Sequence, residues 1–381
     1  MPYVPPVAFT TLTRHEPIGE ISVSALNTEY TLPNRGGLLP MNRFMFGLRL
    51  TFEGRITMPA AGGPSAVRAD DRYALIEEVT VDGFHIGRGQ QEEFFRLRGP
   101  EIRQLARIYT GHEPLSTPSS FSFAGGATND VRFMLDVPFV PLAMPWKAQL
   151  GWLLDAPNYR DLRLRVRVGD GVSIFTSNGS TVTFSAYGSA SGNPRILVDG
   201  IFALGGPSRF AGYTPGRIFR YYREITGSPM TTTANDVRLF DLPTGFGIRG
   251  LLLKTGTKAT VTSGNNAYAT LSDDILTEVR IYRGLNTINR HYRSFHAMRE
   301  DHVGAGSVLI VPTDTGYALL DWARLGWDGE LLNTSGLVAG PSGSVDLFLQ
   351  ANVAGASDQA LLVALEEWRY VPFKQPAIGR R

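Results

Sequence analysis

Two short segments of this 381-residue chain repeat each other: FGLRL at 46–50 and FGIRG at 246–250. A second pair, LIEEVTV at 75–81 and ILTEVRI at 275–281, has the same spacing of 200 residues. Two matches that share one offset are much rarer by chance than either match alone. The pairs therefore predict that the chain contains two copies of one structural unit.

Later segments extend the repeat at smaller offsets. RFMLDV at 132–137 resembles YALLDW at 317–322, and the alternating segments at 161–168 and 344–353 correspond to each other. Insertions in surface loops between matching strands produce such a drift. We expect each half to run strand, strand, helix, strand, strand, strand. Two units of this length are too few and too large for a solenoid, whose repeats run about 20–50 residues.

Strand signals dominate both halves. DLRLRVRV at 161–168 alternates apolar residues with arginines, which predicts a strand with one buried and one solvated face. The runs at 195–204 and 360–371 are more continuously apolar, as in strands inside a sandwich. Glycine (42) and proline (24) are scattered along the chain, typical of many strands joined by turns. The arginine row favours a solvated or interface face over phosphate contacts, and it consists of Arg163, Arg165 and Arg167.

Two segments are predicted to be helices. The first, 100–111, has Pro100 in its first turn and Gly111 as a stop, with an apolar stripe between them. The second, 288–301, has apolar residues at helical spacing: Ile288, Tyr292 and Phe295. The predicted fold class is therefore all-β, with two tandem β-sandwiches and a short helix in each.

The domain divisions follow from the repeat and from a connector rich in glycine and proline at 205–217. We expect four parts: an N-terminal arm at 1–16, a first sandwich at 17–210, a second sandwich at 211–373 and a C-terminal tail at 374–381.

Residues suited to catalysis or metal binding are sparse. Cysteine is absent, which excludes disulfides, thiol nucleophiles and Cys-based metal sites. No His-x-His pair occurs, and the spacings of 5 and 6 among the last three histidines scatter them around a helix. We interpret the histidines as ordinary helix or surface residues in preference to ligands: His15, His85, His112, His291, His296 and His302. We expect no catalytic, cofactor or metal site.

Other functional signatures are missing too. The adjacent carboxylates at 77–78, 92–93 and 366–367 point to opposite faces of a strand, so they are not catalytic pairs. No phosphate-binding loop or nucleophile elbow precedes a helix. The net charge of +2 favours neither nucleic acid nor an anionic membrane. The N-terminus is not expected to be a signal peptide, and no apolar segment is long enough to span a membrane.

The duplicated sandwich, the helix in each unit and the lack of a catalytic set resemble a known family. It is the double jelly-roll major capsid proteins of tailless icosahedral viruses, the tectivirus and adenovirus lineage. LPMNRFMFGLRLTFEGRIT at 39–57, followed by YALIEEVTVDG at 73–83, is similar to the first strands of its bacterial-virus members. The resemblance implies two tandem jelly rolls, no enzymatic activity and no cofactor.

What the resemblance implies about partners is concrete. Three copies would form a homotrimer with a pseudo-hexagonal outline, and neighbouring trimers would tile the facets of a virion. The remaining partners would be vertex (penton) and minor capsid proteins and, where one exists, an internal viral membrane, without sequence-specific nucleic acid. Assembly would take place in the cytoplasm of the host cell.

An alternative from another class stays open at this point. The chain would then be a two-sandwich glycan-active enzyme or a carbohydrate-binding protein, and it would be a monomer with a cleft between the sandwiches. Candidate cleft residues are grouped only by proximity in sequence: Asp321, Trp322, Trp327 and Glu330.

Overall fold

The structure is a computed structural model of the chain. It describes residues 13–32, 39–40, 43–86, 89–110, 113–140, 153–203, 217–225, 233–241, 247–258, 268–283, 286–292, 294–304, 314–321, 332–333, 347–354 and 359–370. Within these ranges no helix has the length and apolar character needed to cross a membrane.

The first half of the chain forms a jelly roll of two facing four-stranded sheets. One sheet has the order β1-β11-β3-β7, and the other has the order β2-β9-β4-β5. Eight antiparallel strands in two Greek keys define this fold. The strands are β1 (Thr13–Ser22), β2 (Thr28–Thr31), β3 (Phe44–Thr57), β4 (Ile76–His85), β5 (Gln90–Leu97), β7 (Thr128–Pro138), β9 (Tyr159–Val168) and β11 (Arg195–Ala203). Shorter strands extend the first sheet: β6 (Ser116–Thr117), β8 (Leu154–Asp155) and β10 (Thr183–Ser185).

The second half repeats this topology strand for strand. Its sheets have the orders β12-β21-β14-β18 and β13-β20-β16-β17. The strands are β12 (Arg217–Ile225), β13 (Ala234–Asp241), β14 (Gly247–Lys258), β16 (Leu276–Arg283), β17 (Asn286–Tyr292), β18 (Tyr317–Asp321), β20 (Leu347–Val353) and β21 (Gln359–Tyr370), with short β15 (Tyr268–Leu271) and β19 (Leu332–Asn333) beside β14. The predicted all-β fold of two tandem jelly rolls is confirmed.

The repeated segments occupy equivalent strands. The FGLRL segment lies in β3, and the repeat of it enters β14, the matching strand of the second jelly roll. LIEEVTV and ILTEVRI lead into β4 and β16, and both strands change register at the same point, between Ile76 and Glu78 and between Leu276 and Glu278. The repeated segments therefore share a β-bulge as well as a strand.

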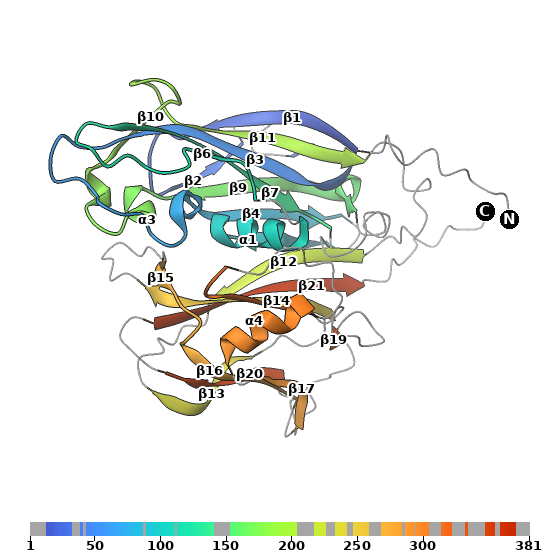
Figure 1. The fold of residues 1–381 in the computed structure, drawn as a ribbon. Helices are drawn as coiled ribbons and strands as arrows, with labels where there is room; N and C mark the ends of the chain where they lie inside the picture. Colours follow the sequence, from blue (N-terminus) through green and yellow to red (C-terminus); the bar gives the residue numbers. More distant parts are fainter. Residues whose placement is uncertain are drawn as a thin grey trace, which may run out of the picture.

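The two jelly rolls are stacked (Figure 1). From top to bottom lie the β1-β11-β3 layer, the β9 and β4 layer with α1, the β12-β21-β14 layer and the β16-β20-β13 layer. A parallel pairing of β12 with β5 at Tyr221↔Phe95 and Tyr222↔Arg96 joins the second and third layers into one ten-stranded sheet. The first core is built from the inward residues of its strands, such as Leu48, Leu50 and Phe52 of β3.

The helices agree with the sequence in one case and differ in the other. The helix expected at 100–111 is α1 (Gly99–Thr110). The helix expected at 288–301 is wrong over its first part, because β17 covers Asn286–Tyr292 and α4 covers Phe295–Gly304. Residues four apart share a face in a strand as well as in a helix, so Ile288 and Tyr292 did not discriminate between the two. The helix begins after Ser294, whose Oγ accepts from the N–H of Ala297 at 3.0 Å.

The predicted order of elements omitted three strands per unit. β1 and β2 precede β3, β12 and β13 precede β14, and β5 and β17 each lie just before the helix. Additional short elements occupy the loops of the first unit: α3 (Gly171–Ile174) and the 3-10 helices η3 (Asp71–Leu75), η5 (Ala156–Asn158) and η6 (Gly179–Thr181).

The domain divisions stay predictions. β1 begins at Thr13, so the last residues of the expected arm at 1–16 lie in this strand. The boundary expected after residue 210 and the tail at 374–381 lie outside the described residues.

Candidate functional site

The junction between the jelly rolls is formed by one face of the sheet that contains β14 and β18. Leu252 lies opposite Leu319, and Lys254 lies opposite Tyr317, so these four side chains share a face. Leu252, Tyr317 and Leu319 belong to the same buried apolar cluster as the core of the first jelly roll. That face of the second unit is therefore packed against the first unit. The opposite face carries Leu251 and Leu253, both fully buried.

Lys254 sits in the centre of this junction among acidic groups of the first jelly roll. Its Nζ lies 2.7 Å from Asp70 Oδ2 and 3.3 Å from Glu101 Oε1. The exposed fractions of the three side chains are 0% for Lys254, 2% for Asp70 and 0% for Glu101. The hydroxyl of Tyr317 donates to Asp70 Oδ1 at 3.2 Å. We call these four residues, Lys254, Asp70, Glu101 and Tyr317, the Lys254 cluster.

The surroundings of the cluster orient its members. The backbone N–H of Arg98 donates to Glu101 Oε2 at 3.1 Å, at the start of α1. The Nζ of Lys254 lies over the ring of Tyr268, 4.6 Å from its centroid. Gly256, two residues along the strand, makes room for that ring, because a Cβ there would lie 2.7 Å from Cδ1 of Tyr268.

The protonation of Tyr317 follows from its position. Burial raises the pKa of Tyr317 well above its ordinary value of 10.0, and the negative charges of Asp70 and Glu101 raise it further. The hydroxyl thus keeps its proton and acts as a donor to Asp70.

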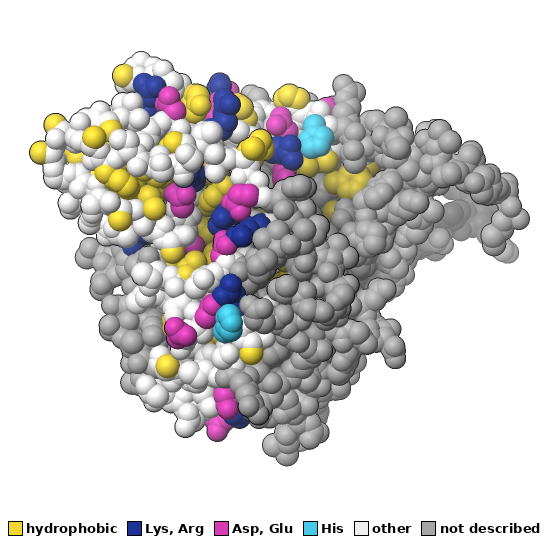
Figure 2. All heavy atoms as spheres, viewed as in Figure 1, with side chains coloured by type: hydrophobic (Ala, Val, Ile, Leu, Met, Phe, Trp, Pro, Cys, Tyr) yellow, Lys and Arg dark blue, Asp and Glu magenta, His cyan; other side chains and the backbone are white. Residues whose placement is uncertain are grey.

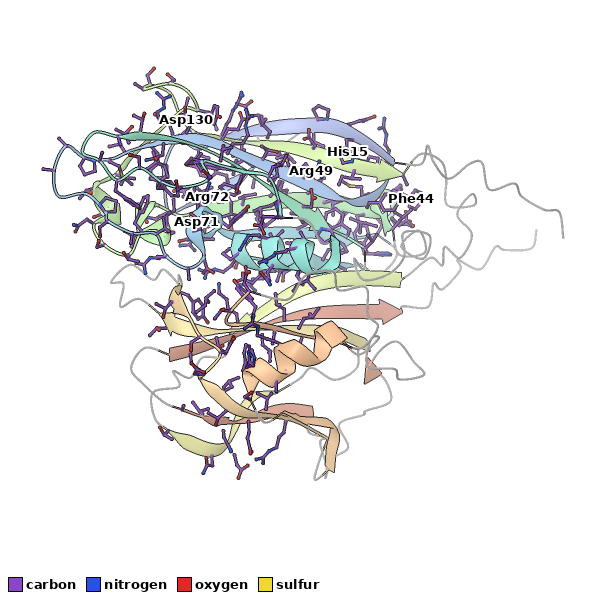
Figure 3. All side chains as sticks on the ribbon, viewed as in Figure 1. His15, Phe44, Arg49, Asp71, Arg72 and Asp130 are labelled. Carbon is purple, nitrogen blue, oxygen red and sulfur yellow. The ribbon has the colours of Figure 1, made fainter. Side chains whose placement is uncertain are left out.

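A second group of ion pairs links α1 of the first unit to the segment before β18 of the second unit. Arg103 and Arg107 project from α1, and both pair with Asp314, which lies three residues before β18. The distance from Arg103 Nη1 to Asp314 Oδ2 is 3.1 Å. Glu113 pairs with the same two arginines. Figure 3 shows α1 directly above the layer that contains β12 and β14.

The opposite surface of the first jelly roll carries a row of cross-strand ion pairs. Arg49 and Asp136 form a two-point contact at 2.7 and 3.1 Å, and so do Arg55 and Asp130 at 2.7 and 3.0 Å. Directly opposed charges of this kind stabilise an antiparallel sheet. Arg49 and Asp130 are labelled on the upper sheet in Figure 3, and Figure 2 shows charged side chains of both signs side by side on the upper jelly roll.

Glu53 lies between these two pairs on β3. Its side chain is only 5% exposed, because Arg132 and Arg195 cover it from the neighbouring strands at 2.6 and 2.9 Å. We call the outward-facing side chains of β3, β7 and β11 the outer β3 face. In the second jelly roll the equivalent face is the one packed against the first unit. In a single chain the outer β3 face has no such cover from the described residues.

The histidines that the structure describes lie in different environments, and the absence of a ligand role stays a prediction. His15 is exposed on β1 and His296 is exposed on α4. His85 is buried at the end of β4, with its ring 4.8 Å from that of Tyr159. The side chains of His291 and His302 are not described, and His112 lies outside the described residues. Within the described part of the chain, no group of His, Asp and Glu is arranged to hold a metal ion.

The arginine row on β9 is an ion-paired face. Arg165 pairs with Asp82 at 3.4 Å, and Arg167 pairs with Glu77 at 3.2 Å. Phe94 and Phe95 of the neighbouring strand β5 are buried in the core of the first jelly roll. Of the residues proposed for a glycan cleft, Asp321 ends β18 with its side chain undescribed, and Trp322, Trp327 and Glu330 lie outside the described residues.

Sequence reasoning missed the Lys254 cluster. The available signal is Lys254 itself, one of four lysines in the chain, which follows three leucines in a strand. A charge inside such an apolar run needs a buried partner. Its partners Asp70 and Glu101 lie 184 and 153 residues away, so no local pattern could indicate them.

Comparisons with known proteins agree with this architecture. No protein-family model matches the sequence, and a search of curated proteins finds no match. The solved structures include the major capsid protein of Sulfolobus turreted icosahedral virus, with a TM-score of 0.62 and 14% identity over 95% of this chain and 97% of that chain. For the major capsid protein P2 of bacteriophage PM2 the TM-score is 0.52, with 10% identity over 96% of this chain and 100% of that chain.

A third solved structure, the PBCV-1 protein VP54 fitted into the virophage Sputnik, has a TM-score of 0.54 and 13% identity over 93% of each chain. These likenesses span nearly the whole of both chains. The fold of this protein is therefore the double jelly roll of viral major capsid proteins.

Proposed function

We propose that this protein is a structural major capsid protein of an icosahedral virus and is not an enzyme. The observation that carries the proposal is the double jelly roll, shared over nearly the whole chain with two major capsid proteins at TM-scores of 0.62 and 0.52. The glycan-active alternative has no such support, because the similar solved structures are capsid proteins.

The junction supports this function physically. A capsomer needs its two jelly rolls held in one fixed orientation, since a change of angle would spoil the fit to its neighbours. Three devices hold them here: the apolar contacts of Leu252 and Leu319, the Lys254 cluster, and the parallel pairing of β5 with β12. Because burying charges costs desolvation free energy, such a network adds little net stability, and we propose that this one fixes the orientation of the two units.

The stacking supports a proposal for the contact between copies in a homotrimer. Within one chain, the β14 and β18 face of the second unit packs on the α1 side of the first. If an equivalent contact forms between two chains, the outer β3 face of one copy packs on the α4 side of the second jelly roll of the other copy. Such a head-to-tail contact forms a ring when its rotation closes. Three chains would then give six jelly rolls and a pseudo-hexagonal outline.

The charges on the outer β3 face suit that role. The face consists of paired charges around a centre formed by Thr51, Met134 and Leu197, which lie opposite one another. Neighbouring trimers, vertex and minor capsid proteins, and any internal membrane would contact other surfaces of the ring. Sequence-specific nucleic acid is not among the proposed partners, and assembly is proposed to occur in the host cytoplasm before the protein resides in the virion.

The mass of the purified protein in solution tests this function. We expect three times 41.7 kDa or larger assemblies, and hexagonal outlines by electron microscopy. A stable monomer that binds oligosaccharide would refute the capsid function and favour the glycan-active alternative.

A pair of variants tests the proposed contact face. Thr51→Arg adds a bulky cation to the centre of the outer β3 face without removing an ion pair, and it is expected to reduce trimer formation. Ser120→Arg is the matched control, because it adds the same side chain at an exposed loop position that is not part of β3, β7 or β11. Trimers of unchanged stability for Thr51→Arg would show that another face makes the contact.

A further inference from the structure

The Lys254 cluster has a chemistry that goes beyond holding two charges together. A primary amine contacts a carboxyl group, a second carboxyl group contacts the same amine, and a hydroxyl donates to the far oxygen of the first carboxyl group. Lys254 Nζ reaches Asp70 Oδ2 at 2.7 Å and Glu101 Oε1 at 3.3 Å. Water has almost no access, since the side chains of these three residues are at most 2% exposed.

We propose that Lys254 and Asp70 condense to an intramolecular isopeptide bond that joins the two jelly rolls covalently, with Glu101 as the catalytic acid–base. Lys254 is on β14 of the second unit, and Asp70 precedes η3 in the first unit. The bond would therefore cross the junction and close a loop between residues 184 positions apart.

The condensation requires a neutral amine and a carboxylic acid, so its first step is a proton transfer within the Lys254–Asp70 ion pair. Two opposite charges in a buried apolar site pay a large desolvation cost, and moving a proton from Nζ to Asp70 Oδ2 removes both charges. The product is a free amine beside a carboxylic acid, which is the reactive pair. A desolvated lysine amine is also a recognised nucleophile in proteins.

The bond changes then balance without any cofactor. The nitrogen lone pair of Lys254 attacks Cγ of Asp70, and the developing negative charge on Oδ1 accepts the hydrogen bond of Tyr317. Glu101 takes a second proton from Nζ and passes it to the departing Oδ2 hydroxyl as the C–O bond breaks. The products are one amide and one water molecule, and Glu101 returns to its starting form. Nothing is oxidised or reduced.

The surroundings position each participant. The backbone N–H of Arg98 fixes Glu101 through its other oxygen, at 3.1 Å. The rings of Tyr268 and Tyr317 lie 4.6 and 5.2 Å from Nζ and leave it little freedom to swing away from Asp70. Exclusion of water from this site also protects the amide from hydrolysis once it has formed.

Mass spectrometry of the denatured protein tests the proposal. The intact chain is expected to be lighter than its sequence mass by one water molecule, and a protease digest is expected to contain a branched peptide in which residue 70 is joined to residue 254. A folded wild-type protein that keeps its full mass after prolonged incubation, with the two residues in separate linear peptides, would overturn the proposal in favour of a plain ion pair.

Variants separate the roles of the residues. Glu101→Gln keeps the shape of the side chain but cannot accept the proton, so it is expected to retain the full mass and linear peptides. A mass deficit that persists in Glu101→Gln would overturn the catalytic role of Glu101. Lys254→Met removes the nucleophile and is expected to retain the full mass, whereas Lys258→Met on the same strand should still lose the water.

Two further considerations allow the presence of the bond to be decided from these experiments. If Lys254→Met fails to fold, the peptide map of the wild-type protein decides the question alone. The proposal is also independent of the capsid function, because trimers can form with or without the bond and a monomer can contain it.

Discussion

Truncating Leu252 should weaken the packing at the junction between the jelly rolls, because this side chain lies between the two units. Leu252 is 1% exposed and lies in the apolar cluster that the two units share. Leu252→Ala removes three carbon atoms, at about 0.8 kcal/mol for each buried carbon, or about 2.4 kcal/mol together. The cavity that remains raises the expected loss of unfolding free energy to about 3–5 kcal/mol.

The neighbouring residue on the same strand is a matched control. Leu253 is 0% exposed, but it points to the opposite face of the sheet, into the second jelly roll. Leu253→Ala should cost a similar free energy by denaturant unfolding. The two variants should differ in hydrogen exchange: Leu252→Ala should speed exchange in α1, whereas Leu253→Ala should act on strands of the second unit. Equal effects of the two variants on α1 would refute the assignment of these faces.

Two further predictions concern pH. The hydrogen bond from Arg55 lowers the pKa of Asp130, so this contribution to stability is present at neutral pH and is lost as the pH falls through the folded-state pKa. Asp130→Asn should lower the free energy of unfolding by no more than about 1 kcal/mol at neutral pH and should have no effect in strong acid. Urea unfolding at both pH values measures the difference. Burial raises the pKa of Tyr317, so the folded protein holds this proton more tightly than the unfolded chain, and stability should fall as the pH rises above the ordinary tyrosine value of 10.0. Tyr317→Phe should flatten this alkaline decline in thermal unfolding, and an unchanged decline would contradict the role of Tyr317.

Much of the architecture was predictable because it depends on local patterns. Alternation along 161–168 predicted β9, and the repeated segments predicted β3, β4 and their partners in the second unit. Glu78 and Glu278 occupy equivalent positions, because each directly follows a register change in its strand. Turn residues and side-chain period act over a few residues, so they can be read without knowing the fold.

The second helix shows where local patterns fail. Ile288 and Tyr292 are four residues apart, and this spacing fits both a helix and a strand. Pairing with β16 decided the outcome, with Tyr292 opposite Val279 and His291 opposite Arg280. A strand is stabilised by its neighbour, and the neighbour is chosen by the tertiary fold.

The sequence by itself determined that this protein consists of two similar β-sandwiches with a helix in each. The repeated segments and the alternation of apolar and polar side chains are local patterns that can be recognised without the fold. Only the tertiary structure decided which faces meet. Lys254 finds Asp70 and Glu101 across 184 and 153 residues, and its burial forces that contact because a charge without partners in the junction would be too costly. Long-range pairing of this kind leaves no periodic signal, so the junction and its chemistry became visible only in the folded molecule.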